Sequence, residues 1–235
     1  MPTLLLVRHG CTSANSAGIL AGWTPGVGLD NTGKQQVARV AERLADLPLS
    51  RVVSSPLQRC QETTTALIGN RDVSLYNDDR LGECHYGSWT GGKISELAQD
   101  PLWRSVQDYP SMARFPESPN YAAESLREMY ARAVDAARDI DTTVAQHHGP
   151  DAVWVAVSHG DVIKAVLADA LGIHLDGFQR IMVRPASLSA IRYTERRSFI
   201  VRMNDTAGDM LDLMTPILNG GDATPGGETG ADSSD

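Results

Sequence analysis

The chain has only three cysteines among its 235 residues, Cys11, Cys60 and Cys84, and no two of them have CxxC spacing. An odd and scattered set argues against a disulfide framework and against a zinc knuckle. The sequence also has no apolar run long enough to span a bilayer, and no basic segment precedes its first apolar residues. These absences favour a reducing, cytoplasmic location and disfavour a membrane partner.

An excess of positive charge is missing as well. The chain has 29 acidic and 21 basic residues, which give a formal net charge of -8. The field of such a molecule repels polyanions, so nucleic acid and anionic membrane surfaces are disfavoured as partners. An anionic small substrate must therefore be attracted by a local basic pocket.

Strand and helix patterns alternate along a chain that is long enough to bury one substantial core. The strand candidates are short aliphatic runs at residues 3–7, 51–54, 73–76 and 153–157, followed by a hairpin of residues 187–193 and 199–203. This alternation predicts an α/β fold, a three-layer αβα sandwich with a mostly parallel sheet and one antiparallel edge hairpin.

Residue pairs with capping-box spacing mark three helix starts. These pairs are Thr32 with Gln35, Ser55 with Gln58 and Ser125 with Glu128. A fourth helix is expected to run from a cap at Asp161 to Gly172. Arg59 follows the Ser55 cap within the first turn, and helical side chains lean toward the helix N-terminus. Its guanidinium is therefore expected at the rim of the sheet.

The expected domain organisation is one catalytic domain over residues 1–204 with a tail. Residues 92–121 are rich in Pro, Trp, Tyr and Arg and poor in periodicity, which is typical of an inserted lid or specificity segment. Residues 205–218 have the spacing of a C-terminal helix. Residues 219–235 are almost free of apolar side chains and are expected to be disordered. Substrate discrimination is expected to lie with Trp103, Arg114, Phe115 and Tyr121.

Two histidines follow the two clearest strand candidates. His9 lies two residues after the run 3–7, and His159 lies two residues after the run 153–157. Ligands of open α/β sheets bind beyond the carboxyl ends of the strands, so the two side chains are expected to share one cleft. A neutral imidazole attacks phosphorus when one ring nitrogen is held as N–H and the other faces the substrate.

Two arginines and one carboxylate complete the candidate site. Arg8 and Arg59 present planar, permanently charged forks that match phosphate oxygens. Glu83 lies in a glycine-rich loop, residues 81–91, and a carboxylic acid whose pKa is raised by burial can protonate a leaving alkoxide. The same carboxylate can then activate water.

Four segments resemble motifs of the histidine phosphatase superfamily, in its phosphoglycerate mutase-like branch. They are LLLVRHGCTSAN (4–15), SSPLQRCQET (54–63), LGECHYGSWTG (81–91) and VSHG (157–160), in the family's order. The resemblance implies that His9 is the nucleophile and Glu83 the general acid and base. It also implies that Arg8, Arg59, His159 and Asn15 hold the phosphoryl group, with no metal and no cofactor.

The sequence thus predicts a metal-independent phosphomonoester hydrolase that forms a phosphohistidine and acts on a small phosphorylated substrate. One alternative is a phosphomutase of the same fold, which must hold a second phosphate, but Lys93, Arg104 and Arg114 are scattered along the inserted segment. The other is a non-catalytic module that binds phosphorylated ligands. Such a module has no need for a proton donor at Glu83. The physiological substrate is left open, and folds of this class often form homo-oligomers.

Overall fold

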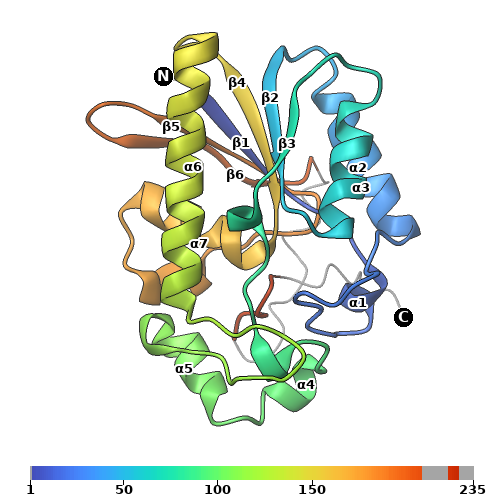
Figure 1. Cartoon of the computed structure of the whole chain (residues 1–235), viewed down its shortest axis with the longest axis vertical. Coiled ribbons are helices and arrows are strands. Elements are labelled where there is room, and N and C mark those ends of the chain that lie inside the picture. Colours follow the sequence, from blue (N-terminus) through green and yellow to red (C-terminus); the bar gives the residue numbers. More distant parts are fainter. Residues whose placement is uncertain (1, 208–221, 228–235) are drawn as a thin grey trace.

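The computed structural model describes residues 2–207 and 222–227. Within these residues, six strands form one sheet in the order β3-β2-β4-β1-β5-β6 (Figure 1). β1 to β4 are parallel, and β5 and β6 are antiparallel to their neighbours. The strands are β1 (Thr3–Arg8), β2 (Leu49–Ser54), β3 (Leu75–Asn77), β4 (Val153–Ser158), β5 (Leu188–Tyr193) and β6 (Ser198–Asp205). The predicted mostly parallel sheet with an antiparallel edge hairpin is confirmed.

Alternating side chains of the central strands build the two halves of the core. Leu4 and Leu6 of β1 pack against α6 and α7, whereas Leu5 and Val7 pack against α2 and α3. The helices of the described chain are α1 (Ser13–Ser16), α2 (Asn31–Arg43), α3 (Gln58–Ile68), α4 (Ile94–Leu97), α5 (Leu102–Asp108), α6 (Leu126–His148) and α7 (Gly160–Leu171). Helices therefore cover both faces of the sheet, and the predicted three layers are confirmed (Figure 1).

The helix starts differ from the predicted caps in three of four cases. Ser125 caps α6 with the predicted capping box. The side chain of Asp30, two residues before Thr32, caps α2 because its carboxylate accepts the N–H of Gly33. Leu57 precedes α3 in place of Ser55, and α7 begins one residue before Asp161.

Three neighbouring strands end at the same edge of the sheet. Arg8 of β1 pairs with Ser158 of β4, and Ser54 of β2 pairs with Val157. The residues that follow β1, β2 and β4 are therefore brought together at one rim. Figure 1 shows α1, α4 and α5 at this same end of the molecule.

The expected lid, residues 92–121, packs mainly against the core. Trp103 and Phe115 are buried in the larger hydrophobic cluster, and Arg114 pairs with Glu128. Its helices α4 and α5 are short. Among the described residues, no helix is long and apolar enough to cross a membrane.

Only part of the expected disordered tail, residues 219–235, can be compared with the structure, since residues 219–221 and 228–235 lie outside the described residues. Residues 222–227, here called the C-terminal strap, were expected to be disordered but are held on the domain. Asp222 accepts hydrogen bonds from Trp103 Nε1 and Arg104 Nη2, at 2.8 and 2.6 Å. Gln107 forms two further bonds with Ala223. The polar composition of the strap predicts disorder. The sequence gives no sign of the ordered contacts, because the partners of Asp222 and Ala223 lie more than 100 residues away along the chain. Asp205 ends β6, and most of the predicted helix at 205–218 lies outside the described residues.

Candidate active site

One ring nitrogen of His9 is unprotonated and keeps its lone pair. Its Nδ1 lies 2.8 Å from the carbonyl oxygen of Gly10, so Nδ1 carries the proton and donates to that carbonyl. Arg59 Nε donates to Nε2 of the same ring at 3.3 Å. A guanidinium is a donor only, so Nε2 is unprotonated. The backbone carbonyl thus fixes the ring tautomer that a nucleophilic imidazole requires.

Ser55 orients the imidazole ring of His159. Ser55 follows β2, and its hydroxyl oxygen lies 2.7 Å from Nε2 of His159. Arg59 Nη2 lies 3.1 Å from Nδ1, so Nδ1 accepts and Nε2–H donates to the hydroxyl. The rings of His9 and His159 lie edge to face with centroids 5.2 Å apart.

Both imidazoles are neutral in this environment. Burial, reinforced by the charges of Arg59 and Arg8, lowers the pKa of His9 well below 6.5. Burial and the same two arginines also lower the pKa of His159 well below that value. A buried cation beside a buried imidazole disfavours a second positive charge, so the lone pairs remain available at neutral pH.

Arg59 is the central cation of the site. Besides the two histidines, its Nη2 donates to the carbonyl oxygen of Gly22 at 2.9 Å. Arg8 is fully buried beneath the site, and its Nη1 donates to the carbonyl oxygen of Val183 at 2.7 Å. The predicted two-arginine, two-histidine cluster is therefore present at the carboxyl ends of the strands.

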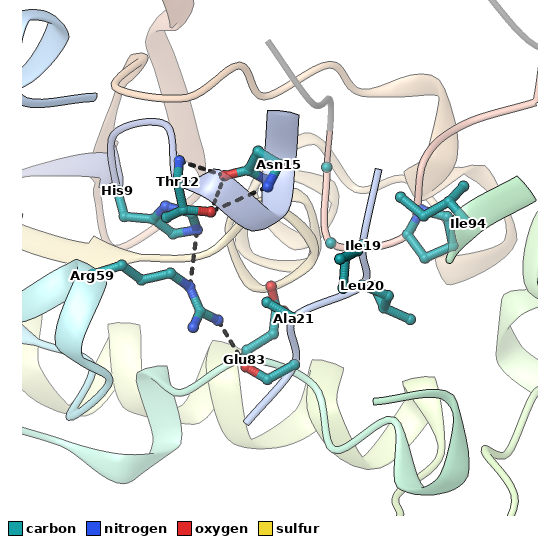
Figure 2. Close-up of a pocket in the computed structure, with 13 residues that line it drawn as sticks. His9, Thr12, Asn15, Ile19, Leu20, Ala21, Arg59, Glu83 and Ile94 are labelled. Atoms are coloured by element: carbon teal, nitrogen blue, oxygen red, sulfur yellow. Dashed lines mark hydrogen bonds between the residues drawn. The ribbon is translucent and has the colours of Figure 1, made fainter. Parts of the chain in front are cut away.

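Glu83 is buried, and it lies on the side of Arg59 that faces away from His9 (Figure 2). Its Oε1 accepts the N–H of Cys84 at 2.9 Å, and its Oε2 lies 3.8 Å from Nδ1 of His159. Burial, with the negative charge of Asp161 as the next cause, raises the pKa of Glu83 from 4.5 to about 7. The carboxyl group can therefore carry a proton near neutral pH, as a general acid must.

The loop that carries Glu83 is held by a residue that the sequence patterns did not single out. Arg132 on α6 donates to the carbonyl oxygens of Arg80, Gly82 and Glu83, at 2.8, 2.8 and 3.0 Å. Its charge is balanced by Glu124, at 2.6 Å. The guanidinium thus fixes the backbone on which the acid stands.

Asp161 links the C-terminal strap to the site. Its Oδ2 accepts the hydroxyl of Tyr86 and the backbone N–H of Gly226, both at 2.8 Å. The strap packs closely here: a Cβ added at Gly160 would lie 2.3 Å from the carbonyl oxygen of Gly226, and one at Gly227 would lie 2.8 Å from Arg8 Nη1. The strap therefore covers Arg8 and the start of α7.

A pocket of about 350 Å³, including its open side, lies against His9, Arg59 and Glu83 (Figure 2). Asn15 also lines it, with its amide oxygen held by the N–H and hydroxyl of Thr12. The rest of the wall comes from Ile19, Leu20, Ala21, Gly22, Ile94, Pro225, Gly226 and Gly227. Ile94 is the residue of the inserted segment, residues 92–121, that lines the pocket.

The four residues expected to discriminate substrates lie elsewhere. Trp103 and Phe115 are core residues, and neither Arg114 nor Tyr121 is among the residues that line the pocket. The aromatic and basic residues of this irregular segment predicted a substrate-binding surface. In the structure, the large side chains of the segment pack on the domain instead.

Ser55, Arg132 and Asp161 were missed as site residues because their partners are distant in sequence.

Comparisons with known proteins agree with this geometry. The model of the histidine phosphatase superfamily, branch 1, matches residues 4–206. The chain is 29% identical over 211 residues to phosphoserine phosphatase 1 of Hydrogenobacter thermophilus, covering 88% of this chain and 93% of that protein. It is 28% identical over 225 residues to a probable phosphoglycerate mutase of Erwinia tasmaniensis, covering 93% and 98%.

A solved structure carries the same fold. YhfR of Bacillus stearothermophilus superposes with a TM-score of 0.77 at 26% identity, over 87% of this chain and 98% of that one. With a matching family model over most of its length and the two histidines at neighbouring strand ends, the chain belongs to the histidine phosphatase superfamily, branch 1.

Proposed function

We propose that the protein is a phosphomonoester hydrolase that transfers the phosphoryl group first to His9 and then to water. The observation that carries this proposal is the orientation of His9, whose Nδ1–H is bound to the Gly10 carbonyl while Nε2 keeps its lone pair beside Arg59. An imidazole held in this way is an activated nucleophile.

In the first step, Nε2 of His9 attacks phosphorus and the bond from phosphorus to the alcohol oxygen breaks. The alcohol oxygen takes the proton of Glu83, so that the alcohol leaves neutral and the carboxyl group becomes a carboxylate. A pKa of about 7 leaves a large share of Glu83 protonated at neutral pH.

In the second step, a water molecule attacks the phosphohistidine. The carboxylate of Glu83 takes one proton of that water, the bond from phosphorus to Nε2 breaks, and inorganic phosphate leaves. Each step returns Glu83 to the state that the other step requires, so one residue serves as acid and base.

Positive charge from the protein supports both transfers. In the proposal, Arg8 and Arg59 neutralise the phosphoryl oxygens and Asn15 donates its amide N–H. His159 donates from Nδ1 once that nitrogen gains a proton on binding of the phosphate dianion. Because these groups already supply the charge that the transition state needs, no metal ion is part of the proposal. We expect activity to persist in excess chelator.

Cys60 is a weaker candidate nucleophile than His9. Its sulfur lies 3.4 Å from Nε2 of His159, but burial raises the pKa of the thiol to about 12. The thiolate is the reactive form of cysteine, so this side chain stays inert at neutral pH.

The lining of the pocket favours hydrolysis over phosphoryl transfer to a second phosphorylated alcohol. A mutase must bind a second phosphate, and among the described residues that line the pocket Arg59 is the one permanent cation. The protonatable Glu83 also favours catalysis over a module that only binds phosphorylated ligands, because binding needs no proton donor.

Trapping of the covalent intermediate tests the proposal. The protein is mixed with phosphate-labelled substrate, quenched rapidly in alkaline denaturant and digested. We expect an acid-labile label on the peptide that contains His9, and His9→Ala should abolish both the label and turnover. Label on His159, a serine or a cysteine, with His9→Ala still active, would overturn the assignment.

Three expectations remain, which concern the location of the protein in the cell, its partners and its oligomeric state. We propose a cytoplasmic protein whose partner is a small phosphorylated substrate. Its three cysteines support this setting, since Cys11, Cys60 and Cys84 are buried thiols that form no disulfide. Self-association stays a prediction, and the sedimentation of the purified chain would test it.

A further inference from the structure

The part of the pocket beyond the phosphate-binding groups is apolar. Figure 2 shows Ile19, Leu20 and Ile94 on the side away from His9 and Arg59. The methyl group of Ala21 and the ring of Pro225 complete this wall. The alcohol part of a bound phosphate ester therefore meets hydrocarbon, which favours apolar surface on the substrate.

Several polar groups around this wall are engaged within the protein, and the amide N–H₂ of Asn15 is assigned to the phosphoryl group in the proposed mechanism. The carbonyl oxygen of Gly22 accepts from Arg59, and the amide oxygen of Asn15 accepts from both the N–H and the hydroxyl of Thr12. The N–H of Gly226 is bound to Asp161. The first two are acceptors that repel an anion, and the third is a donor already in use, so a second anionic group on the substrate gains no partner from them.

Apart from Arg8 and Arg59, which the proposed mechanism assigns to the phosphoryl group, four cations of the surrounding segments are paired with carboxylates. They are Lys93 with Glu96, Arg104 with Asp222, Arg132 with Glu124 and Lys164 with Asp161, at 3.6, 2.6, 2.6 and 3.6 Å. The sequence of residues 208–221 and 228–235 contains no lysine or arginine and five acidic residues. No cation can therefore come from that part of the chain.

A substrate carboxylate would be poorly stabilised at this wall. Burial of an ionised carboxylate without a partner is strongly unfavourable, because the lost hydration is not replaced. The buried carboxylate of Asp161 adds negative charge close to the site, where it adds to the effect of burial in raising the pKa of Glu83. Ile19, Ala21 and Ile94 keep the wall apolar whether or not the C-terminal strap stays in place.

We propose that the substrate is the phosphate monoester of an uncharged alcohol with an apolar face, and that esters carrying a carboxylate are poor substrates. This inference rests on the proposed phosphatase function and narrows its substrate class. It excludes as preferred substrates the amino acid and glyceric acid esters for which two of the relatives are named.

A matched set of esters tests the inference on the full chain. Glycerol 3-phosphate and 3-phosphoglycerate differ in one end group, a hydroxymethyl against a carboxylate, and benzyl phosphate adds an apolar ring. We expect kcat/KM to be at least about tenfold higher for glycerol 3-phosphate than for 3-phosphoglycerate, and highest for benzyl phosphate. An equal or higher kcat/KM for 3-phosphoglycerate would overturn the inference.

A single substitution should change this order. Ile94→Arg places a cation at the half-buried start of α4 and should raise kcat/KM for 3-phosphoglycerate by about tenfold or more, through a charge-assisted bond to the carboxylate. Ser95→Arg adds the same charge at the exposed neighbouring position and serves as the control. A similar gain in Ser95→Arg would show that overall charge, and not the wall, limits these substrates.

Different experimental results would contradict the inferred substrate class and the phosphatase function. If nitrophenyl phosphate labels His9 but 3-phosphoglycerate is the better substrate, the inference on substrate class is wrong and the phosphatase function stands. If no ester is hydrolysed and no label forms on His9, the function itself is wrong, and the inference falls with it.

Discussion

The hydroxyl oxygen of Ser55 lies 2.7 Å from Nε2 of His159 and fixes the nitrogen with which His159 faces the phosphate site. Nδ1 of this ring faces Arg59, so it is also the nitrogen nearest the incoming phosphate. If Nδ1 gains a proton when the dianion binds, Nε2–H keeps its acceptor in Ser55. The hydroxyl therefore serves both charge states of the ring.

Ser55→Ala is expected to lower kcat by about 10-fold to 100-fold. The substitution leaves the buried Nε2–H with only the weak sulfur acceptor of Cys60 at 3.4 Å, at a cost of about 1–3 kcal/mol, and frees the ring to turn. The loss should be smaller than the roughly 10²–10³ expected for His159→Ala, which removes the donor itself. Steady-state kinetics of the purified variant measure it.

A double-mutant cycle separates positioning from general damage to the fold. In the His159→Ala background, Ser55→Ala should cause almost no further loss, because both changes remove the same interaction. Ser54→Ala is the matched control, since the hydroxyl of this buried neighbour bonds to the Ser55 carbonyl and to Gln61. Additive losses from Ser55 and His159 would contradict the positioning role.

The raised pKa of Glu83 predicts the alkaline limb of the pH profile. Glu83 donates its proton in the first step, so kcat/KM for an alkyl phosphate should fall about tenfold for each pH unit above about 7. His9 is already neutral because its pKa lies well below 6.5. The acid limb should therefore follow the substrate phosphate, whose second ionisation lies near 6. Glu83→Gln should lose the alkaline limb, and its persistence would assign the limb to another group.

Glu83→Gln should also separate substrates by their leaving groups. A general acid contributes about 10²–10⁴ to the rate, so an alkyl phosphate should lose about that factor. A nitrophenyl ester leaves without protonation and should still give a burst of nitrophenolate, because the phosphohistidine forms but is hydrolysed slowly. Stopped-flow absorbance detects the burst. Equal losses for the two esters would remove Glu83 from the role of acid.

The C-terminal strap should compete with phosphate analogues. Gly227 packs so closely on Arg8 that an added Cβ would lie 2.8 Å from Nη1, and a phosphoryl oxygen that reaches this nitrogen has to displace the strap. Weakening the anchors with Asp222→Ala and Gln107→Ala should lower the inhibition constant of vanadate by about fivefold or more, since one hydrogen bond is worth about 1 kcal/mol.

Asp108→Ala is the control for the strap, because Asp108 lies 3.9 Å from Nε of Arg104, the residue that also pairs with Asp222. It should leave the inhibition constant unchanged. An unchanged or higher constant in the double variant would show that the strap does not occupy the path of the phosphate.

The α/β fold and the meeting of the catalytic groups at one rim could both be predicted from local sequence patterns. Buried parallel strands leave a strong local pattern, and residues directly after such strands must lie at the carboxyl edge of the sheet. His9 and His159 follow β1 and β4, and Arg59 follows a helix start, so their proximity could be predicted from local patterns alone. The Ser125 capping box was readable for the same reason, since all its partners are local.

The groups that support these residues, and the surface that surrounds the substrate, became visible only in the folded chain. Ser55 has the pattern of a helix cap but bonds to His159, 104 residues away. The strap has the composition of a disordered tail, yet Asp161 and Trp103 hold it from 65 and 119 residues away. The apolar wall combines residues near Ile19, Ile94 and Pro225. Such contacts form between segments whose local sequences carry no sign of one another, so only the packing of the whole chain brings them together.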